Sequence, residues 1–121
     1  MPIPAKLRAE LNEDPFMHVC AFTGQENPCW HHSWTYKGKR LTERWAILPV
    51  IEDRHSAQSN LKAIHNDHTL KEYAEYLCLC RMTAEELQSA LKKYPRIDWI
   101  GIFAKLKQKY MYFDIDKHLF S

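Results

Sequence analysis

Residues 30–36 read Trp-His-His-Ser-Trp-Thr-Tyr, an aromatic stretch that predicts a β-strand carrying two adjacent histidines, His31 and His32. Successive side chains of a strand point to opposite sides. One imidazole is therefore placed to bind a metal ion while its neighbour faces a substrate. This arrangement suits metal-assisted hydrolysis better than a structural zinc site. A further histidine, His55, follows soon after the apolar run Trp45-Ala-Ile-Leu-Pro-Val50.

The segments around this strand predict a small β-rich unit. Residues 17–23 have strand character and residues 24–28 supply turn residues, so we expect a hairpin that pairs the first segment with the histidine strand. Residues 45–50 are mostly apolar, and Pro49 argues against a central position in a sheet. The first 15 residues contain three prolines, which discourage regular structure there.

The second half of the chain predicts helices. Residues 55–66 contain neither Pro nor Gly and are expected to form one helix. Thr69 and Thr83 each precede a glutamate by three residues, which is the spacing of a capping box, and Asp98 is a further cap. Residues 111–121 give no clear signal. Apolar side chains at helical spacing form three core-facing stripes: Leu70, Tyr73, Ala74 and Leu77; Leu87, Ala90, Leu91 and Tyr94; Ile100, Phe103, Leu106 and Tyr110.

Length and composition indicate one globular domain. The chain has 121 residues, 45% of them hydrophobic, and a formal net charge of +2. No signal peptide and no run of about 18 apolar residues is visible, so we expect an intracellular protein without a membrane span. The four cysteines then read as thiols rather than disulfides. Cys78 and Cys80 are expected to lie in or near the core of a helical region.

Basic residues cluster close to the histidine pair in the sequence. The segment Tyr36-Lys-Gly-Lys-Arg40 and Arg44 follow it, and three lysines recur between residues 105 and 109. Such a patch is suited to contact phosphate groups, and its binding would weaken with salt. A solvated loop and a solvated helix face explain the same residues without any ligand, and the composition leaves both interpretations open.

Several of these segments, taken in order, resemble the HNH endonucleases, which have the ββα-metal fold. The matching pieces are Cys20-Ala-Phe-Thr-Gly24, His31-His32, Tyr36-Lys-Gly-Lys-Arg40, Trp45-Ala-Ile-Leu-Pro-Val50 and Glu52-Asp-Arg-His55. The similarity covers roughly residues 18–66 and is greatest to small phage and prophage members. Tyr94-Pro-Arg-Ile-Asp-Trp99 and Leu106-Lys-Gln-Lys-Tyr110 also resemble the C-terminal helix of those phage proteins.

The resemblance implies a role for each histidine. His31 and His55 would be metal ligands, and His32 would be the general base that activates water. His65 is the first candidate for a third ligand, with Asn60 and His68 as alternatives. His65 lies ten residues beyond His55. One straight helix would therefore separate them by about 15 Å, and a break in that helix is required.

The resemblance also implies which residues contact DNA and where the chain departs from the family. The expected DNA-binding residues are Tyr36, Lys37, Lys39, Arg40 and Arg44. Ile51 and Arg54 stand where many relatives have the Cys-x-x-Cys of a zinc knuckle, so no four-cysteine zinc site is expected. The family's middle Asn has no obvious counterpart, and Glu43 or Thr42 is a substitute.

The sequence thus predicts an α+β single domain, residues 1–121, with an HNH-like ββα-metal core at 18–66 and a helical extension at 67–121. The predicted activity is metal-dependent DNA cleavage in the cytoplasm (that of the host, if the protein is phage encoded). It would use one divalent ion, Mg²⁺, Mn²⁺, Ni²⁺ or Zn²⁺.

Other interpretations of the same residues stay open. The chain could be a non-catalytic DNA-binding or recombination accessory protein that keeps the fold. It could also be a structural zinc module built from Cys20, Cys29 and two histidines. Taken singly, each histidine also fits an ordinary role as a half-buried or surface side chain. The tryptophans at 30, 34 and 45 are better explained by packing than by base stacking.

Overall fold

The computed structural model describes residues 3–55 and 63–120. Its elements alternate between short strands and helices in the first half and are helical in the second. In chain order they are α1 (Ala5–Glu13), the 3-10 helix η1 (Pro15–His18), β1 (Cys29–His32), β2 (Thr35–Tyr36), β3 (Lys39–Arg40), the 3-10 helix η2 (Arg44–Ala46), β4 (Ile47–Val50), α2 (Glu52–His55), α3 (His68–Arg81), α4 (Ala84–Lys93), α5 (Trp99–Tyr110) and α6 (Ile115–Phe120).

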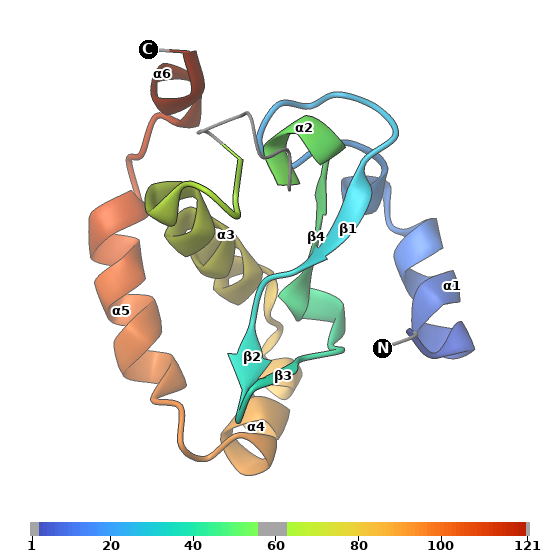
Figure 1. Ribbon diagram of the computed structural model, residues 1–121. Helices are drawn as coiled ribbons and strands as arrows, with labels where there is room; N and C mark the ends of the chain where they lie inside the picture. Colours follow the sequence, from blue (N-terminus) through green and yellow to red (C-terminus); the bar gives the residue numbers. More distant parts are fainter. Residues whose placement is uncertain (1–2, 56–62, 121) are drawn as a thin grey trace.

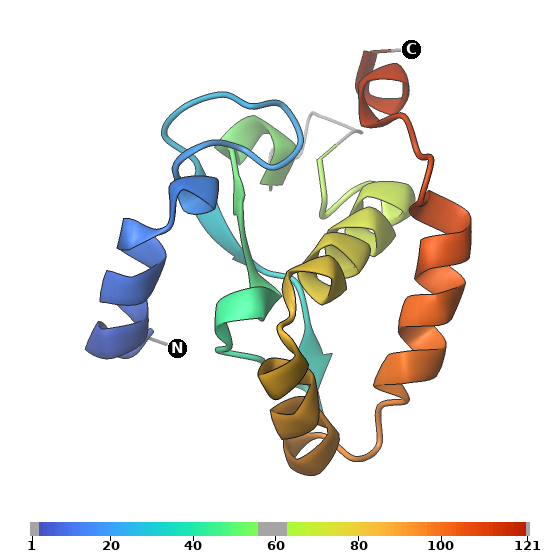
Figure 2. The ribbon, with the colours of Figure 1, turned by 180° about the vertical axis from the view of Figure 1, so that it is seen from behind.

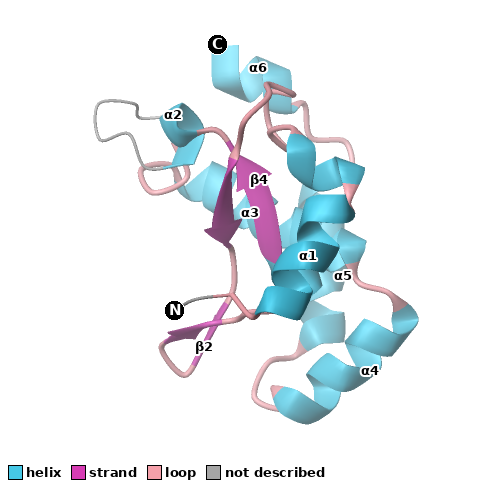
Figure 3. Cartoon of the chain, turned by 90° about the vertical axis from the view of Figure 1, so that its right-hand side faces the viewer, coloured by secondary structure: helices cyan, strands magenta, loops and turns pink. Residues whose placement is uncertain are grey.

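The pair of strands β1 and β4 lies between two sets of helices (Figure 1). Helix α1 lies on one side, and α3 followed by α5 lies on the other, as the view from behind also shows (Figure 2). Helix α4 and the β2–β3 hairpin lie at one end, while α2 and α6 lie at the other. Figure 3 shows how small the strand content is beside the helices. The predicted α+β class is confirmed.

The partner of β1 is β4, and the predicted hairpin between residues 17–23 and β1 is wrong. The two strands are antiparallel, with His31 opposite Leu48 and His32 opposite Ile47. Residues 17–23 contribute one isolated bridge, from Val19 to Glu26, and otherwise form the end of η1 and a turn. The strand signal reflected burial instead, because Met17, Cys20 and Phe22 are all core residues. Pro49 is tolerated because, in the described chain, β1–β4 is a two-stranded sheet.

Opposed residues of the two strands share a face, which gives the sheet two different sides. All four residues of β4 are buried. Leu48 and Val50 belong to the main core with α3 and α5, whereas Ile47 packs with Leu11 of α1 and Met17. His31 therefore shares the side of the helices α3 and α5, and His32 shares the side of α1.

Helix α1 contradicts the expectation that the first 15 residues lack regular structure. The prolines at 2 and 4 precede the helix, and Pro4 is its N-cap residue, where a missing N–H costs no helical hydrogen bond. Pro15 follows its end and begins η1. Leu11 is fully buried and anchors the helix. The prolines thus delimit a helix rather than prevent one.

The caps of the later helices are mostly as predicted. Thr83 and Glu86 form a complete capping box at α4, and the Asp98 side chain accepts a hydrogen bond from Gly101 N at α5. At α3 the cap is Asp67 rather than Thr69, because the Asp67 carboxylate accepts from both Thr69 N and Leu70 N. The unassigned residues 111–121 contain the short helix α6.

The predicted helix over residues 55–66 is wrong as one continuous element. Helix α2 ends at His55, residues 56–62 lie outside the described chain, and residues 64–66 form a turn. The backbone N–H of Ile64 donates a hydrogen bond to the Arg54 carbonyl, 2.7 Å away. The chain therefore returns to α2 instead of running away from it.

The main core is built on three tryptophans and the buried face of α3. Trp99 packs against Trp34 and Trp45, with ring centroids 5.0 and 5.3 Å apart, so the packing role predicted for these rings is confirmed. Cys78 is fully buried as expected, but Cys80 is exposed, because two residues along a helix turn the side chain away from the core. Ile100 is 62% exposed, so the last predicted stripe is only partly buried. In the ranges 3–55 and 63–120, no helix is long and apolar enough to cross a membrane.

Candidate functional site

His31 lies against His65 on the helical side of the β1–β4 pair. The His31 side chain is 7% exposed, and its Nδ1 is hydrogen-bonded to Ser33 Oγ at 2.8 Å. Its ring meets the His65 ring edge to face, with centroids 5.5 Å apart and planes at 77°. The two residues are far apart in sequence, so the fold has brought together two of the predicted metal ligands.

The backbone at position 55 is beside His65 as well. Ile64 N donates a hydrogen bond to Arg54 O. Ile64 directly precedes His65 in the chain, and Arg54 directly precedes His55, so the bond brings the two predicted ligand positions close together. Buried Ala63 and Ile64 anchor this turn in the core. The break in the helix that a third ligand at His65 requires is therefore present. The side chain of His55, and all of Asn60, lie outside the described part of the structure.

The geometry of the two described histidines bears on whether they share an ion. The ring centroids are 5.5 Å apart, so the two side chains are close enough to be considered as ligands of one ion, while their edge-to-face arrangement is that of an aromatic contact. The hydrogen bond at His31 Nδ1 fixes the ring, as the outer partners of metal-bound histidines do. Among the side chains that are described, which do not include His55, no three His, Cys, Asp or Glu residues are grouped closely enough to hold a metal.

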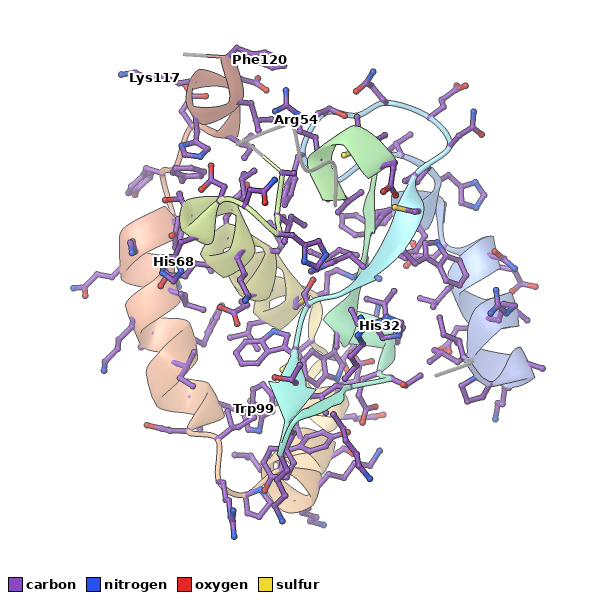
Figure 4. The ribbon with its side chains drawn as sticks, in the orientation of Figure 1. His32, Arg54, His68, Trp99, Lys117 and Phe120 are labelled. Atoms are coloured by element: carbon purple, nitrogen blue, oxygen red, sulfur yellow. The ribbon has the colours of Figure 1, made fainter. Side chains whose placement is uncertain are left out.

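His68, one alternative ligand, does not join this pair. It is the first residue of α3, its side chain is 84% exposed, and its Nε2 lies 3.8 Å from Glu72 Oε2. Figure 4 places it on the side of α3 that faces α5, well away from His32. Of the two alternatives that are described, His65 is the one that meets His31.

His32 faces an open groove on the opposite side of the sheet. Figure 4 shows its ring on the α1 side of β1. The groove has a volume of about 420 Å³ and is lined by Arg8 and Asn12 of α1, Trp30 and His32 of β1, and by Ile3, Pro28 and Cys29. Burial, and after it the positive charge of Arg40, lower the pKa of His32 below the usual histidine value. The ring is therefore neutral near pH 7 and able to accept a proton.

The chain matches no known protein family, no curated protein and no solved structure.

The β2–β3 hairpin presents three of the predicted DNA-binding residues to solvent. Lys37, Lys39 and Arg40 are all exposed. Lys37 and Gly38 both have positive φ, 51° and 79°, as the two central residues of a type I′ turn require. Tyr36 is more constrained, because its ring packs edge to face on Tyr94 at 5.1 Å and its hydroxyl accepts from Arg96 N at 3.4 Å. It serves to fasten the hairpin to the helical half.

Arg44, also predicted to contact DNA, is engaged inside the protein. Its guanidinium donates to both carboxylate oxygens of Glu86, at 2.7 and 2.8 Å, and to the Arg81 carbonyl at 2.6 Å. These hydrogen bonds of the Arg44 guanidinium connect η2 to α4 and to the end of α3. The sequence could not distinguish Arg44 from the neighbouring basic residues, because its partners lie about 40 residues further along the chain.

The cysteines proposed for a structural zinc module are poorly suited to it. The Cys29 thiol donates to the Val50 carbonyl at 2.9 Å and to Glu52 at 3.6 Å. Burial and the negative charge of Glu52 raise the pKa of Cys29, which opposes the thiolate form that zinc requires.

Two polar residues of the groove, Arg8 and Asn12, were not predicted to be functional. They come from α1, whose apolar positions Leu7 and Leu11 are a short helical signal between prolines. Glu43, a proposed substitute for the family's middle Asn, accepts a hydrogen bond from the Tyr94 hydroxyl at 2.6 Å and pairs with Lys93 at 3.2 Å. Its carboxylate thus faces α4.

Proposed function

We propose that this chain is a metal-dependent DNA endonuclease of the HNH type, in which β1, β4 and α2 form a ββα-metal unit. The observation that carries the proposal is the meeting of His31 and His65 beside the end of α2, with His32 on the other face of the same strand. The antiparallel pairing of β1 with β4, which α2 follows directly, also supports it. His55 is the last residue of α2, whereas the resemblance implies a histidine at the start of the helix.

The residues divide the work of hydrolysing a phosphodiester. His31, His55 and His65 would hold one divalent ion. When bound, such an ion offsets charge on the phosphoryl and leaving oxygens. His32, neutral near pH 7, takes the proton from the attacking water and is the general base.

Exposed cationic side chains of the β2–β3 hairpin would hold the nucleic acid. Lys37, Lys39 and Arg40 project from the β2–β3 hairpin, and Arg40 is close enough to His32 to act on its charge. Contacts of this kind bind phosphate groups and carry no base sequence information. Arg44 is not part of this set, because its donors are used by Glu86 and Arg81.

The experiment is cleavage of supercoiled plasmid by purified protein, with Mg²⁺, Mn²⁺, Ni²⁺ and Zn²⁺ tested separately and with excess chelator. We expect metal-dependent nicking that is lost in His32→Ala. The matched control is His68→Ala, which removes an exposed histidine that touches neither face of the sheet. It should nick as the parent does.

The outcomes separate the proposal from its alternatives. Equal nicking by His32→Ala and the parent would rule out the assigned base. A folded parent that binds DNA but does not cut with any of the four metals would instead indicate the non-catalytic DNA-binding protein.

A further inference from the structure

The groove beside His32 has a second wall that carries its own polar residues. Arg8 and Asn12 lie four residues apart on α1 and both line the groove opposite β1. Residues at this spacing lie on one face of a helix, so the guanidinium and the amide follow one another along the wall. Helix α1 is anchored by the fully buried Leu11, which gives this wall a fixed position.

Arg8 is held at the groove by an aromatic ring. Its guanidinium carbon lies 5.6 Å from the centroid of the Trp30 ring. Trp30 precedes His32 by two residues on β1, so both side chains point to the same side of the strand. A guanidinium over an indole keeps its planar set of N–H donors available to a second partner. Trp30 thereby orients the cation in the groove that also contains the His32 ring.

Arg8 is the cation that lines the groove, and a carboxylate lies at the groove edge, because Glu52 is 3.6 Å from the thiol of the lining residue Cys29. Among the described residues, no carboxylate pairs with the Arg8 guanidinium, and none lines the groove. A second exposed cation, Arg40, comes from the β2–β3 hairpin. An anion that presents two oxygen acceptors to the guanidinium N–H groups, such as a phosphate group, fits this arrangement.

We propose that Arg8, supported by Asn12 and oriented by Trp30, binds a backbone phosphate of the DNA in the groove between α1 and β1, next to His32. This assignment rests on the proposed function, since the groove also contains His32, the proposed general base. It makes α1 part of the nucleic-acid interface, which then extends from the β2–β3 hairpin to the N-terminal helix.

The test is the affinity of Arg8→Ala for a short fluorescent DNA duplex, measured as a function of salt. The measurement is made in the His32→Ala background so that the DNA is not cut. The matched control is Lys6→Ala, which removes an exposed cation from the same helix but not from the groove. We expect Arg8→Ala to weaken binding about tenfold and to reduce the slope of log affinity against log salt by about 1.

Arg8→Lys separates a fixed phosphate contact from general attraction. It should restore the salt slope, because the charge returns. It should restore the affinity only in part, because an ammonium lacks the planar fork that stacks on Trp30. Melting temperatures of all variants are measured beside the affinities, and alanine at position 8 is compatible with the helix.

Two results would overturn the assignment. One is an Arg8→Ala protein that binds with the parent's affinity and salt slope. The other is an equal loss in Arg8→Ala and Lys6→Ala, which would mean diffuse attraction only. If the parent binds DNA but never cuts it, the proposed nuclease function is wrong. The effect of Arg8→Ala on affinity would then still decide whether Arg8 binds a phosphate. A parent that binds no DNA would refute both.

Discussion

The two faces of strand β1 differ in almost every physical property. On one face His31 is buried, bonded to Ser33 and packed on His65, behind the layer formed by α3 and α5. On the other face His32 borders an open groove that Arg8 also lines. Adjacent residues of one strand thus occupy a closed and an open environment, because side chains alternate along a strand.

In the proposed function, this difference gives the metal ligand and the general base to adjacent residues of one strand. On the closed face the His31 ring is fixed by burial and by its hydrogen bond to Ser33. The open face gives access, since α1 forms only one wall of a groove. Substitutions on the closed face should therefore change metal binding or stability, and substitutions on the open face should change DNA binding and cleavage.

The largest effect is expected from removing the paired histidines of the closed face. His31→Ala and His65→Ala should each weaken binding of Ni²⁺ or Zn²⁺ by more than the ~10–100-fold that loss of an outer partner costs. Isothermal titration calorimetry measures this directly. His65 is exposed, so its substitution does not disturb the core as that of His31 does. The control, His68→Ala, should bind metal as the parent does. Unchanged metal binding in His65→Ala would exclude His65 as a ligand.

The second test contrasts Arg44, which is bonded inside the protein, with Lys37, which is exposed on the β2–β3 hairpin. Arg44→Ala should lower the free energy of unfolding by about 2 kcal/mol, because it removes hydrogen bonds to the partly buried Glu86. It should leave the salt dependence of DNA binding unchanged. Lys37→Ala should do the reverse, with less than about 0.5 kcal/mol of destabilisation and a smaller salt slope. Urea unfolding and fluorescence anisotropy give both readouts. A reduced salt slope in stable Arg44→Ala would show that this residue reaches DNA.

The third test uses the pH dependence of stability on the helical side. Burial, with Glu72 nearby, raises the pKa of Glu75 from 4.5 to about 7. The folded state then binds a proton that the unfolded state has released, so stability falls as the pH rises from about 4.5 to 7 and above. Glu75→Gln should therefore be more stable than the parent at pH 8 by about 1–2 kcal/mol, allowing for solvent screening, and close to it at pH 4.5.

Thermal unfolding at the two pH values checks this prediction. Glu85→Gln, an exposed substitution in the first turn of α4, is the control for a general loss of negative charge. If the difference in stability between the parent and Glu75→Gln does not change with pH, the buried environment described for Glu75 is contradicted.

The smallest effect is expected at helix α6. The Phe120 ring lies 5.6 Å from the Arg54 guanidinium carbon, and His118 pairs with Asp67 at 2.7 Å (Figure 4 labels Arg54 and Phe120). Phe120→Ala should cost about 0.5–1 kcal/mol, the worth of an exposed cation–π contact. Because Arg54 directly precedes position 55, the Phe120→Ala substitution should also weaken metal binding slightly. Tyr112→Ala, a change at a residue 92% exposed, is the control. A Phe120→Ala protein as stable as this control would exclude a role for the contact.

Local signals made the helical half predictable. Thr83 with Glu86, and Asp98, act through hydrogen bonds within three residues, so the sequence contains the whole interaction. The strand predicted over residues 30–36 was right only in part, because the stretch is divided into β1 and β2, which belong to different sheets. The cap of α3 was displaced by two residues because Asp67 offers the stronger acceptor in the same turn.

Contacts between distant residues were not predictable from one sequence. The pairing of β1 with β4 joins segments separated by the β2–β3 hairpin, and the apolar run 17–23 gave the same signal as a strand. The meeting of His31 and His65 depends on the return of the chain at Ile64. Arg8 was not predicted because its contact with Trp30 joins two distant segments, and the residues next to Arg8 in the sequence do not reveal it.

The central claim is that metal binding and proton transfer belong to opposite faces of one strand. The most direct measurement takes His32→Ala and records its plasmid nicking and its Ni²⁺ affinity in the same preparation. The account predicts that nicking is lost while the affinity for the ion stays that of the parent. Loss of metal binding together with nicking would place both histidines in one ligand set. Nicking retained at the parent's rate would remove His32 from the reaction.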